Sequence, residues 1–163
     1  MNELLLAVFD LLRVRGGPQR LPASWSLTNG VIGLFIAEEL LTSQGLGASS
    51  DAGQTLLSAA LQFSIIAALL KLRGYPERLA QTLLALAATG IVVGLLAYLL
   101  FLQADPSRNQ PVLALLWFVV FGWNLAVNAN IYRHALAISF SQGVLVAVVL
   151  LAFSYVAMEL VFR

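Results

Sequence analysis

The sequence predicts an all-α fold, a polytopic transmembrane helix bundle of about five spans preceded by an N-terminal interfacial amphipathic helix. Two observations predict it. Of the 163 residues, 60% are hydrophobic and only 10% are charged, whereas soluble domains carry roughly 25% charged residues. The apolar residues also form long blocks, each close to the roughly 20 residues that a helix needs to cross a hydrocarbon core of about 30 Å. A water-soluble fold of this size would have too few charges to cover its surface.

Residues 1–20 are expected to form a cytoplasmic interfacial amphipathic helix and a linker. This helix either lies in the cytoplasmic leaflet or packs under the bundle. Gly16, Gly17 and Pro18 end it. Arg13 and Arg15 follow the apolar stretch, whereas a signal peptide carries its positive charges first, so we expect this segment to be retained. The apolar residues that share one helical face are Leu4, Leu5, Val8, Leu11 and Leu12, with Glu3, Asp10 and Arg13 off that face.

Residues 21–163 are expected to form the five-helix transmembrane domain. Pro22 and the capping candidates Ser24 and Ser26 open its first span. Pro76 precedes the third span. Short linkers make consecutive helices antiparallel, and the junction between the fourth and fifth spans, near residues 132–134, is almost absent. The expected spans are about 24–42, 54–72, 78–103, 111–131 and 135–162.

The basic residues predict the orientation, because cytoplasmic loops collect Lys and Arg. With five spans, seven of the nine basic residues lie on the side of the N-terminus, and only Arg108 and Arg163 lie on the other. We therefore expect a cytoplasmic N-terminus and an outer C-terminus. The seven are Arg13, Arg15, Arg20, Lys71, Arg73, Arg78 and Arg133.

Glu38 and Glu39 interrupt the first span. A carboxylate near a helix centre costs roughly 2.5 to 3.5 kcal/mol on insertion scales. Adjacent residues point about 100° apart, so one narrow helix face cannot hide both. Either the two side chains reach the outer interface or are protonated, or they form an ion or proton site or contact a basic group of a partner subunit. Glu159, near the outer end of the fifth span, is a candidate to join them.

Asn124 and Asn128 are four residues apart and share a helix face. Amides buried in a membrane seek partners, and interhelical hydrogen bonds there average about 0.6 kcal/mol. The pair is expected either to hold helices together or to line a polar substrate path. Gln62 and Ser64 in the second span are candidate partners for either role.

Ala87, Gly90 and Gly94 place small residues on one face of the third span. Such GxxxG patterns let helix backbones approach closely. The face is expected to pack within the bundle or to form a seam between subunits.

No motif for catalysis is found in the sequence. It has no cysteine, its only histidine is His134, and its net charge is +1. A single histidine cannot supply a multi-histidine metal site, and a charge near neutrality gives no field for nucleic acid. Nucleophile elbows, zinc-protease motifs and phosphate loops are absent. We therefore expect no enzyme activity, no catalytic or metal-binding residues, no cofactor and no nucleic-acid partner.

The cytoplasmic N-terminal segment, five closely spaced spans and outer C-terminus together resemble the Yip family of membrane proteins. The segments Leu21-Pro22-Ala23-Ser24 and Tyr132-Arg133-His134-Ala135-Leu136 add to the resemblance. The family's eukaryotic members act in vesicle trafficking with small GTPases. The long acidic cytoplasmic tail common in those members is absent here, so the resemblance implies a bacterial form and argues against a GTPase partner.

These observations predict a non-enzymatic integral membrane protein, a scaffold or accessory subunit of a larger membrane complex. The expected location is the bacterial inner membrane, and the expected partners are the lipid bilayer and other membrane subunits or further copies of the chain. The alternative is a small oligomeric transporter or channel-like protein that uses Glu38, Glu39 and the Asn124–Asn128 face.

Overall fold

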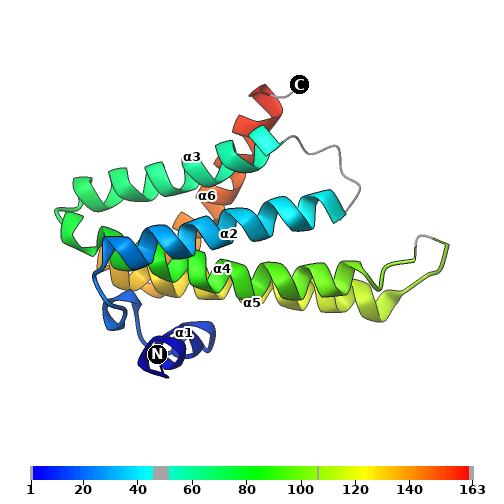
Figure 1. Ribbon diagram of the computed structural model, residues 1–163, viewed down its shortest axis with the longest axis horizontal. Coiled ribbons are helices and arrows are strands. Elements are labelled where there is room, and N and C mark those ends of the chain that lie inside the picture. The colour runs from blue at the N-terminus through cyan, green and yellow to red at the C-terminus, as the bar shows by residue number, and fades with distance from the viewer. Residues whose placement is uncertain (1, 46–51, 106, 162–163) are drawn as a thin grey trace.

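The computed structural model describes residues 2–45, 52–105 and 107–161. These residues form six α-helices and two short 3-10 helices, without a strand, so the predicted all-α fold class is confirmed (Figure 1). In chain order the elements are α1 (Asn2–Leu12), η1 (Pro18–Arg20), α2 (Trp25–Gly45), α3 (Ala52–Leu72), η2 (Pro76–Arg78), α4 (Leu79–Phe101), α5 (Pro111–Leu136) and α6 (Phe140–Val161).

Four of the described helical segments are long and apolar enough to cross a membrane, and they mark the chain as a membrane protein. They are Gly53–Leu72, Pro76–Phe101, Pro111–Leu136 and Phe140–Val161. The helix α2 is as long as α3, at 21 residues, but it contains Glu38 and Glu39. It is not among the four. The expected count of five spans therefore corresponds to four strongly apolar helices and the less apolar α2.

The helices α2, α3, α4 and α5 lie roughly along one axis, and each runs opposite to the helix before it in the chain, so that α2 and α4 point the same way (Figure 1). The helix α6 crosses behind them. The most extensive pairings are α2 with α4, α5 with α6, and α4 with α5. Of the four apolar segments, the one that contains α4 is the most buried, since 44% of its apolar stretch lies inside the protein. The core is formed mainly by Leu84, Ala85 and Ala87 of α4 and by Val127 and Ile131 of α5, all fully buried.

The helices α5 and α6 come into close contact at Gly143. A Cβ atom added to this glycine would collide with the main-chain oxygen of Ala129 on α5. The absence of a side chain at Gly143 therefore allows α6 to lie against the α5 backbone.

The expected junction between the last two spans is wrong. Residues 132–134 are not a break, because α5 continues to Leu136 and α6 begins only at Phe140. The chain turns at Ala137, which has the left-handed conformation (φ 52°, ψ 51°), and the N–H groups of Ala137 and Ile138 both donate to the carbonyl of Arg133. Hydrogen bonds of this kind, made after a residue in the left-handed conformation, commonly close a helix C-terminus. The other helix ends lie closer to the expected ones. The largest of these differences is at α2, which ends at 45 rather than 42.

A capping box starts α6. The Ser139 Oγ accepts a hydrogen bond from the Gln142 N–H at 3.3 Å, and the Gln142 side-chain oxygen accepts one from the Ser139 N–H at 3.0 Å. This reciprocal pair satisfies two N–H groups at the helix start. It explains why α6 starts five residues later than expected, at 140 instead of 135.

The helix α1 is apolar on two sides. Ala7, Leu11 and Leu12 are buried on one side, and α1 contacts α4 and α5. On the other side Leu5 is 63% exposed and Phe9 is 50% exposed. The expected single apolar face is therefore divided, because apolar residues cover more of the circumference of α1 than one packing surface occupies.

Three side chains of the bundle hold the N-terminal segment by its main-chain carbonyls. The Trp123 indole N–H donates to the Leu12 carbonyl at 2.7 Å, and the Asn130 amide donates to the Gly16 carbonyl at 2.7 Å. Gln81 donates to the Leu21 carbonyl at 2.6 Å. α1 and its linker are thus fastened to α4 and α5.

Candidate functional site

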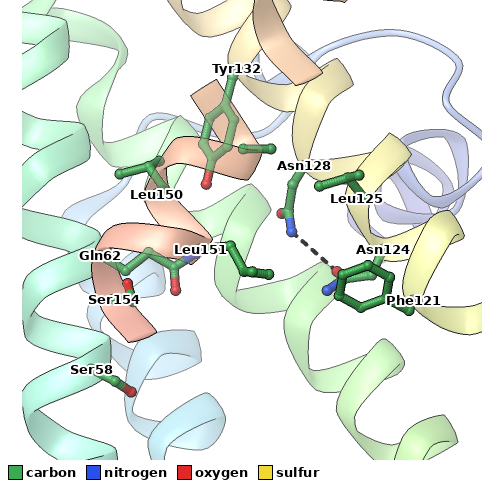
Figure 2. Close-up of a pocket in the computed structure, with 11 residues that line it drawn as sticks. Ser58, Gln62, Phe121, Asn124, Leu125, Asn128, Tyr132, Leu150, Leu151 and Ser154 are labelled. Atoms are coloured by element: carbon green, nitrogen blue, oxygen red, sulfur yellow. Dashed lines mark hydrogen bonds between the residues drawn. The ribbon is translucent and has the colours of Figure 1, made fainter. Parts of the chain in front are cut away.

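A cavity of about 220 Å³ lies between α3, α5 and α6 (Figure 2). We call it the amide cavity, because it holds the side-chain amides of Gln62, Asn124 and Asn128. Apolar side chains, among them Phe121 and Leu151, complete the lining. The six polar residues that line it are Ser58, Gln62, Asn124, Asn128, Tyr132 and Ser154.

One hydrogen bond joins two of these polar side chains. The Asn128 amide nitrogen donates to the Asn124 side-chain oxygen at 3.2 Å, the bond drawn as a dashed line in Figure 2. The Gln62 side chain of α3 and the Tyr132 hydroxyl of α5 line the same cavity (Figure 2). Ser64, the other expected partner of the asparagines, is exposed on α3 and does not line the cavity.

The lining of the amide cavity is uncharged. Its amides and hydroxyls can both donate and accept hydrogen bonds, but no Asp, Glu, His, Lys or Arg is among the lining residues. Amide and hydroxyl groups match neutral hydrogen-bonding groups of a ligand or of another helix. The arrangement offers no strong base and no activated nucleophile of the kind that covalent catalysis needs.

A second pocket, of about 180 Å³, lies between α2, α4 and α5. We call it the acidic pocket, because Glu38 and Glu39 of α2 line it. The remaining lining residues are Thr42, Gly94, Ala97, Tyr98, Phe101 and Trp117. The two pockets share no lining residue.

The small-residue face of α4 packs against α2. A Cβ added at Gly90 would lie 2.7 Å from the Phe35 ring, and one added at Gly94 would lie 2.9 Å from the Glu38 carboxyl oxygens. Ala87, on nearly the same face, is fully buried. In the described structure this face is therefore occupied within the chain, by α2.

The expected gathering of acidic groups is only partly present. Glu159 is exposed on α6 and lines neither pocket. Within the described residues, Glu38, Glu39 and Glu159 form no ion pair. Arg108 instead pairs with Asp105 at 3.2 Å in the loop after α4. Arg163 lies outside the described residues.

The Asp105 carboxyl has local hydrogen-bond donors of its own. Its Oδ1 accepts bonds from the Ser107 hydroxyl at 2.6 Å and from the Ser107 N–H at 3.0 Å. These two hydrogen bonds lower the pKa of Asp105, and the bond from the Ser107 hydroxyl has the larger effect. Asp105 is therefore an ionised loop carboxylate at neutral pH and serves as the counter-charge of Arg108.

His134 has a structural environment. Its Nδ1 lies 2.9 Å from the Asn130 carbonyl, and its ring lies against Gly17, where an added Cβ would come within 2.5 Å of it. In the described parts of the chain, no group of three His, Cys, Asp or Glu side chains is placed to hold a metal ion.

Two of the lining aromatics, Tyr132 and Trp117, were not among the candidate site residues predicted from the sequence. Tyr132 follows Asn128 by four residues, so the spacing that joined Asn124 to Asn128 also extends to Tyr132. Trp117 has no such signal, since its place in the acidic pocket depends on how α5 packs beside α2 and α4.

Comparison with known proteins finds no relative. No protein-family model matches the chain, and no curated protein or solved structure matches it significantly. The function is therefore inferred from the side chains described above.

Proposed function

We propose that this protein is a non-enzymatic scaffold or accessory subunit that holds a transmembrane helix of a partner against its α3–α5–α6 face. The amide cavity carries the proposal. It is polar, uncharged and bordered by α3, which packs only sparsely on the other helices. Only 17% of the apolar stretches of α3 and α5 and 11% of that of α6 are buried, compared with 44% for α4.

The amides explain why a helix is the proposed occupant. Polar groups in hydrocarbon are stabilised by partners in protein, because lipid tails offer none. Beyond the Asn128–Asn124 bond, these two amides make no further hydrogen bond within the described residues. A polar side chain of a neighbouring helix would satisfy them at about 0.6 kcal/mol per bond, and van der Waals packing would supply the rest of the association energy.

The amide cavity also favours the scaffold over the transport alternative. Transport would need Glu38, Glu39 and the Asn124–Asn128 face to line one path, yet these residues lie in two pockets without a common lining residue. The transport alternative therefore requires a path that is formed between the subunits of an oligomer. Ion or solute flux in proteoliposomes that is lost in the double variant Glu38→Gln, Glu39→Gln would favour transport.

Photo-crosslinking tests the scaffold proposal. A photoreactive amino acid at Ser58 or Ser154, which line the amide cavity, is expected to give one discrete adduct with a membrane protein in native membranes. The same group at Leu145, which is 62% exposed on α6 and lines neither pocket, is the control and is expected to label lipid. Replacing Asn124 and Asn128 together by leucine should reduce the adduct severalfold.

The mass of the adduct identifies the partner as a different subunit or as a second copy of the chain. Adducts that are the same at Leu145 and at the cavity positions, or lipid adducts alone, would contradict the proposal. So would turnover of a lipid or peptide substrate by the purified protein.

We further propose that the protein spans the bacterial inner membrane five times with the N-terminus in the cytoplasm. The cysteine-free sequence permits a clean labelling test. A cysteine in place of Asn109, in the exposed α4–α5 loop, should react with an impermeant thiol reagent outside intact cells. A cysteine in place of Glu77, which is exposed at η2, should react only after permeabilisation. The reverse labelling pattern would overturn the orientation and remove the architectural basis for the resemblance to the Yip family.

A further inference from the structure

The acidic pocket combines negative charge with aromatic surface. Glu38 and Glu39 face it from α2, Tyr98 and Phe101 from α4, and Trp117 from α5. It lies outside the amide cavity, and its interpretation does not depend on the scaffold proposal.

The Glu38 carboxyl lacks a partner. Both of its oxygens are buried, and neither has a hydrogen-bond partner within the described residues. They lie against Gly94, where a Cβ would come within 2.9 Å of each. A buried carboxyl without a donor is unfavourable by itself. Glu38 lines the pocket together with Glu39, so a ligand that supplies positive charge or hydrogen-bond donors would stabilise this pair.

The composition of the pocket argues against a metal ion as that ligand. Hard cations such as Ca²⁺ take about six to eight oxygen ligands. Here the side-chain oxygens come from two glutamates, Thr42 and Tyr98, and the Thr42 hydroxyl already donates to the main-chain carbonyls of Glu38 and Glu39 at 3.0 and 3.1 Å. Aromatic rings form much of the remaining lining.

Carboxylates together with aromatic faces suit an organic ammonium group. Ring faces attract cations within about 6 Å of the centroid, and aromatic cages recognise quaternary ammonium ligands in this way. The volume also fits. At about 30 Å³ for each water-sized group, a pocket of about 180 Å³ accepts roughly six such groups. This is the size of an ethanolamine or choline head.

The position of the pocket places such a head close to one membrane surface. Glu38 precedes the last residue of α2, Gly45, by seven residues, which is about 10 Å along a helix that rises about 1.5 Å per residue. Phe101 is the last residue of α4. Both a phospholipid headgroup and a soluble amine could reach this depth.

We propose that the acidic pocket binds an organic ammonium group, with Glu38 and Glu39 as the counter-charges and Tyr98, Phe101 and Trp117 as the aromatic wall. Lipids with ethanolamine or choline heads and free amines present the same chemistry. The pocket recognises the ammonium head and not the rest of the molecule.

The test uses the full chain in detergent and in nanodiscs. Choline chloride and ethanolamine are titrated by calorimetry against the detergent-solubilised protein, and KCl serves as a simple-cation control. Native mass spectrometry then counts the lipid retained from nanodiscs that contain phosphatidylethanolamine and phosphatidylglycerol. The variants are Glu39→Gln and Trp117→Leu. The matched control is Glu159→Gln, which removes one carboxylate from an exposed site outside both pockets.

Each pocket variant is expected to weaken binding of the ammonium ligand about tenfold, the equivalent of about 1.4 kcal/mol, and Glu159→Gln should leave it unchanged. Binding of the free amines alone identifies a soluble ligand, and selective retention of phosphatidylethanolamine identifies a headgroup; either result supports the proposal. If Glu39→Gln fails to fold, Trp117→Leu still tests the aromatic wall. Three results would overturn the proposal: no binding of either ligand class, binding that KCl reproduces, or binding that the pocket variants leave unchanged.

Discussion

Replacing Gly143 by alanine is expected to lower the free energy of unfolding by about 1 to 3 kcal/mol or more, the usual range for overpacking. The added Cβ would meet the main-chain oxygen of Ala129, which no rotamer change can move aside. α5 and α6 would have to separate along one of the most extensive helix pairings of the bundle. Thermal unfolding in detergent micelles, followed by circular dichroism at the helix bands, should show a clearly lower midpoint.

The matched control is Gly122→Ala in α5. A Cβ added there meets nothing within 4 Å. Because alanine is the better helix former by about 1 kcal/mol, this variant should unfold at the wild-type temperature or above it. If Gly143→Ala unfolds at the same temperature as Gly122→Ala, the close α5–α6 contact is not as described.

The replacement of Arg78 by methionine should have the second largest effect. The Arg78 guanidinium donates to the carbonyls of His134 and Ala135 at 3.2 Å each and lies 4.0 Å from the centre of the Tyr75 ring. It thereby joins the start of α4 to the C-terminus of α5, where a positive charge also suits the helix dipole. Hydrogen bonds from charged groups contribute about 1.5 to 3 kcal/mol. Since the Arg78 side chain is 35% exposed, solvent screening reduces the expected loss to about 1 to 2 kcal/mol.

Arg73→Met is the control for charge. Arg73 is exposed and, within the described residues, makes no ion pair, side-chain hydrogen bond or ring contact. Both variants remove one positive charge from the same side of the bundle, so a difference in their thermal midpoints measures the contacts of Arg78 with α5, with the Tyr75 ring and with Glu77. Equal midpoints would show that these contacts contribute nothing to stability.

The fold class could be read from the sequence because long apolar blocks are a one-dimensional signal. The junction between α5 and α6 could not be read from hydropathy, since the helical residues 132–134 include the polar Arg133 and His134. Polar residues at the last turn of a helix are favourable and need not end it. A usable signal was nevertheless present, because Ser139 and Gln142 have the spacing of a capping box.

The candidate sites divide in the same way. Asn124, Asn128 and Tyr132 follow one helical row, so the α5 side of the amide cavity can be derived from spacing. The acidic pocket depends on which helices are neighbours. Periodicity shows that Gly94 lies on a small-residue face, but it does not show that this face meets Glu38. Glu159 was grouped with Glu38 for the same reason, although α6 places it elsewhere.

The attachment of the N-terminal segment has a consequence for the order of events during synthesis. Leu12 and Gly16 are held by Trp123 and Asn130, which follow them by 111 and 114 residues. At about 5 to 20 residues per second, roughly 6 to 23 s pass between translation of α1 and translation of its anchors on α5. During this interval α1, with its exposed leucines, has only the membrane surface and the helices α2, α3 and α4 to cover it. The docking of α1 on α5 therefore follows the synthesis of α2, α3 and α4.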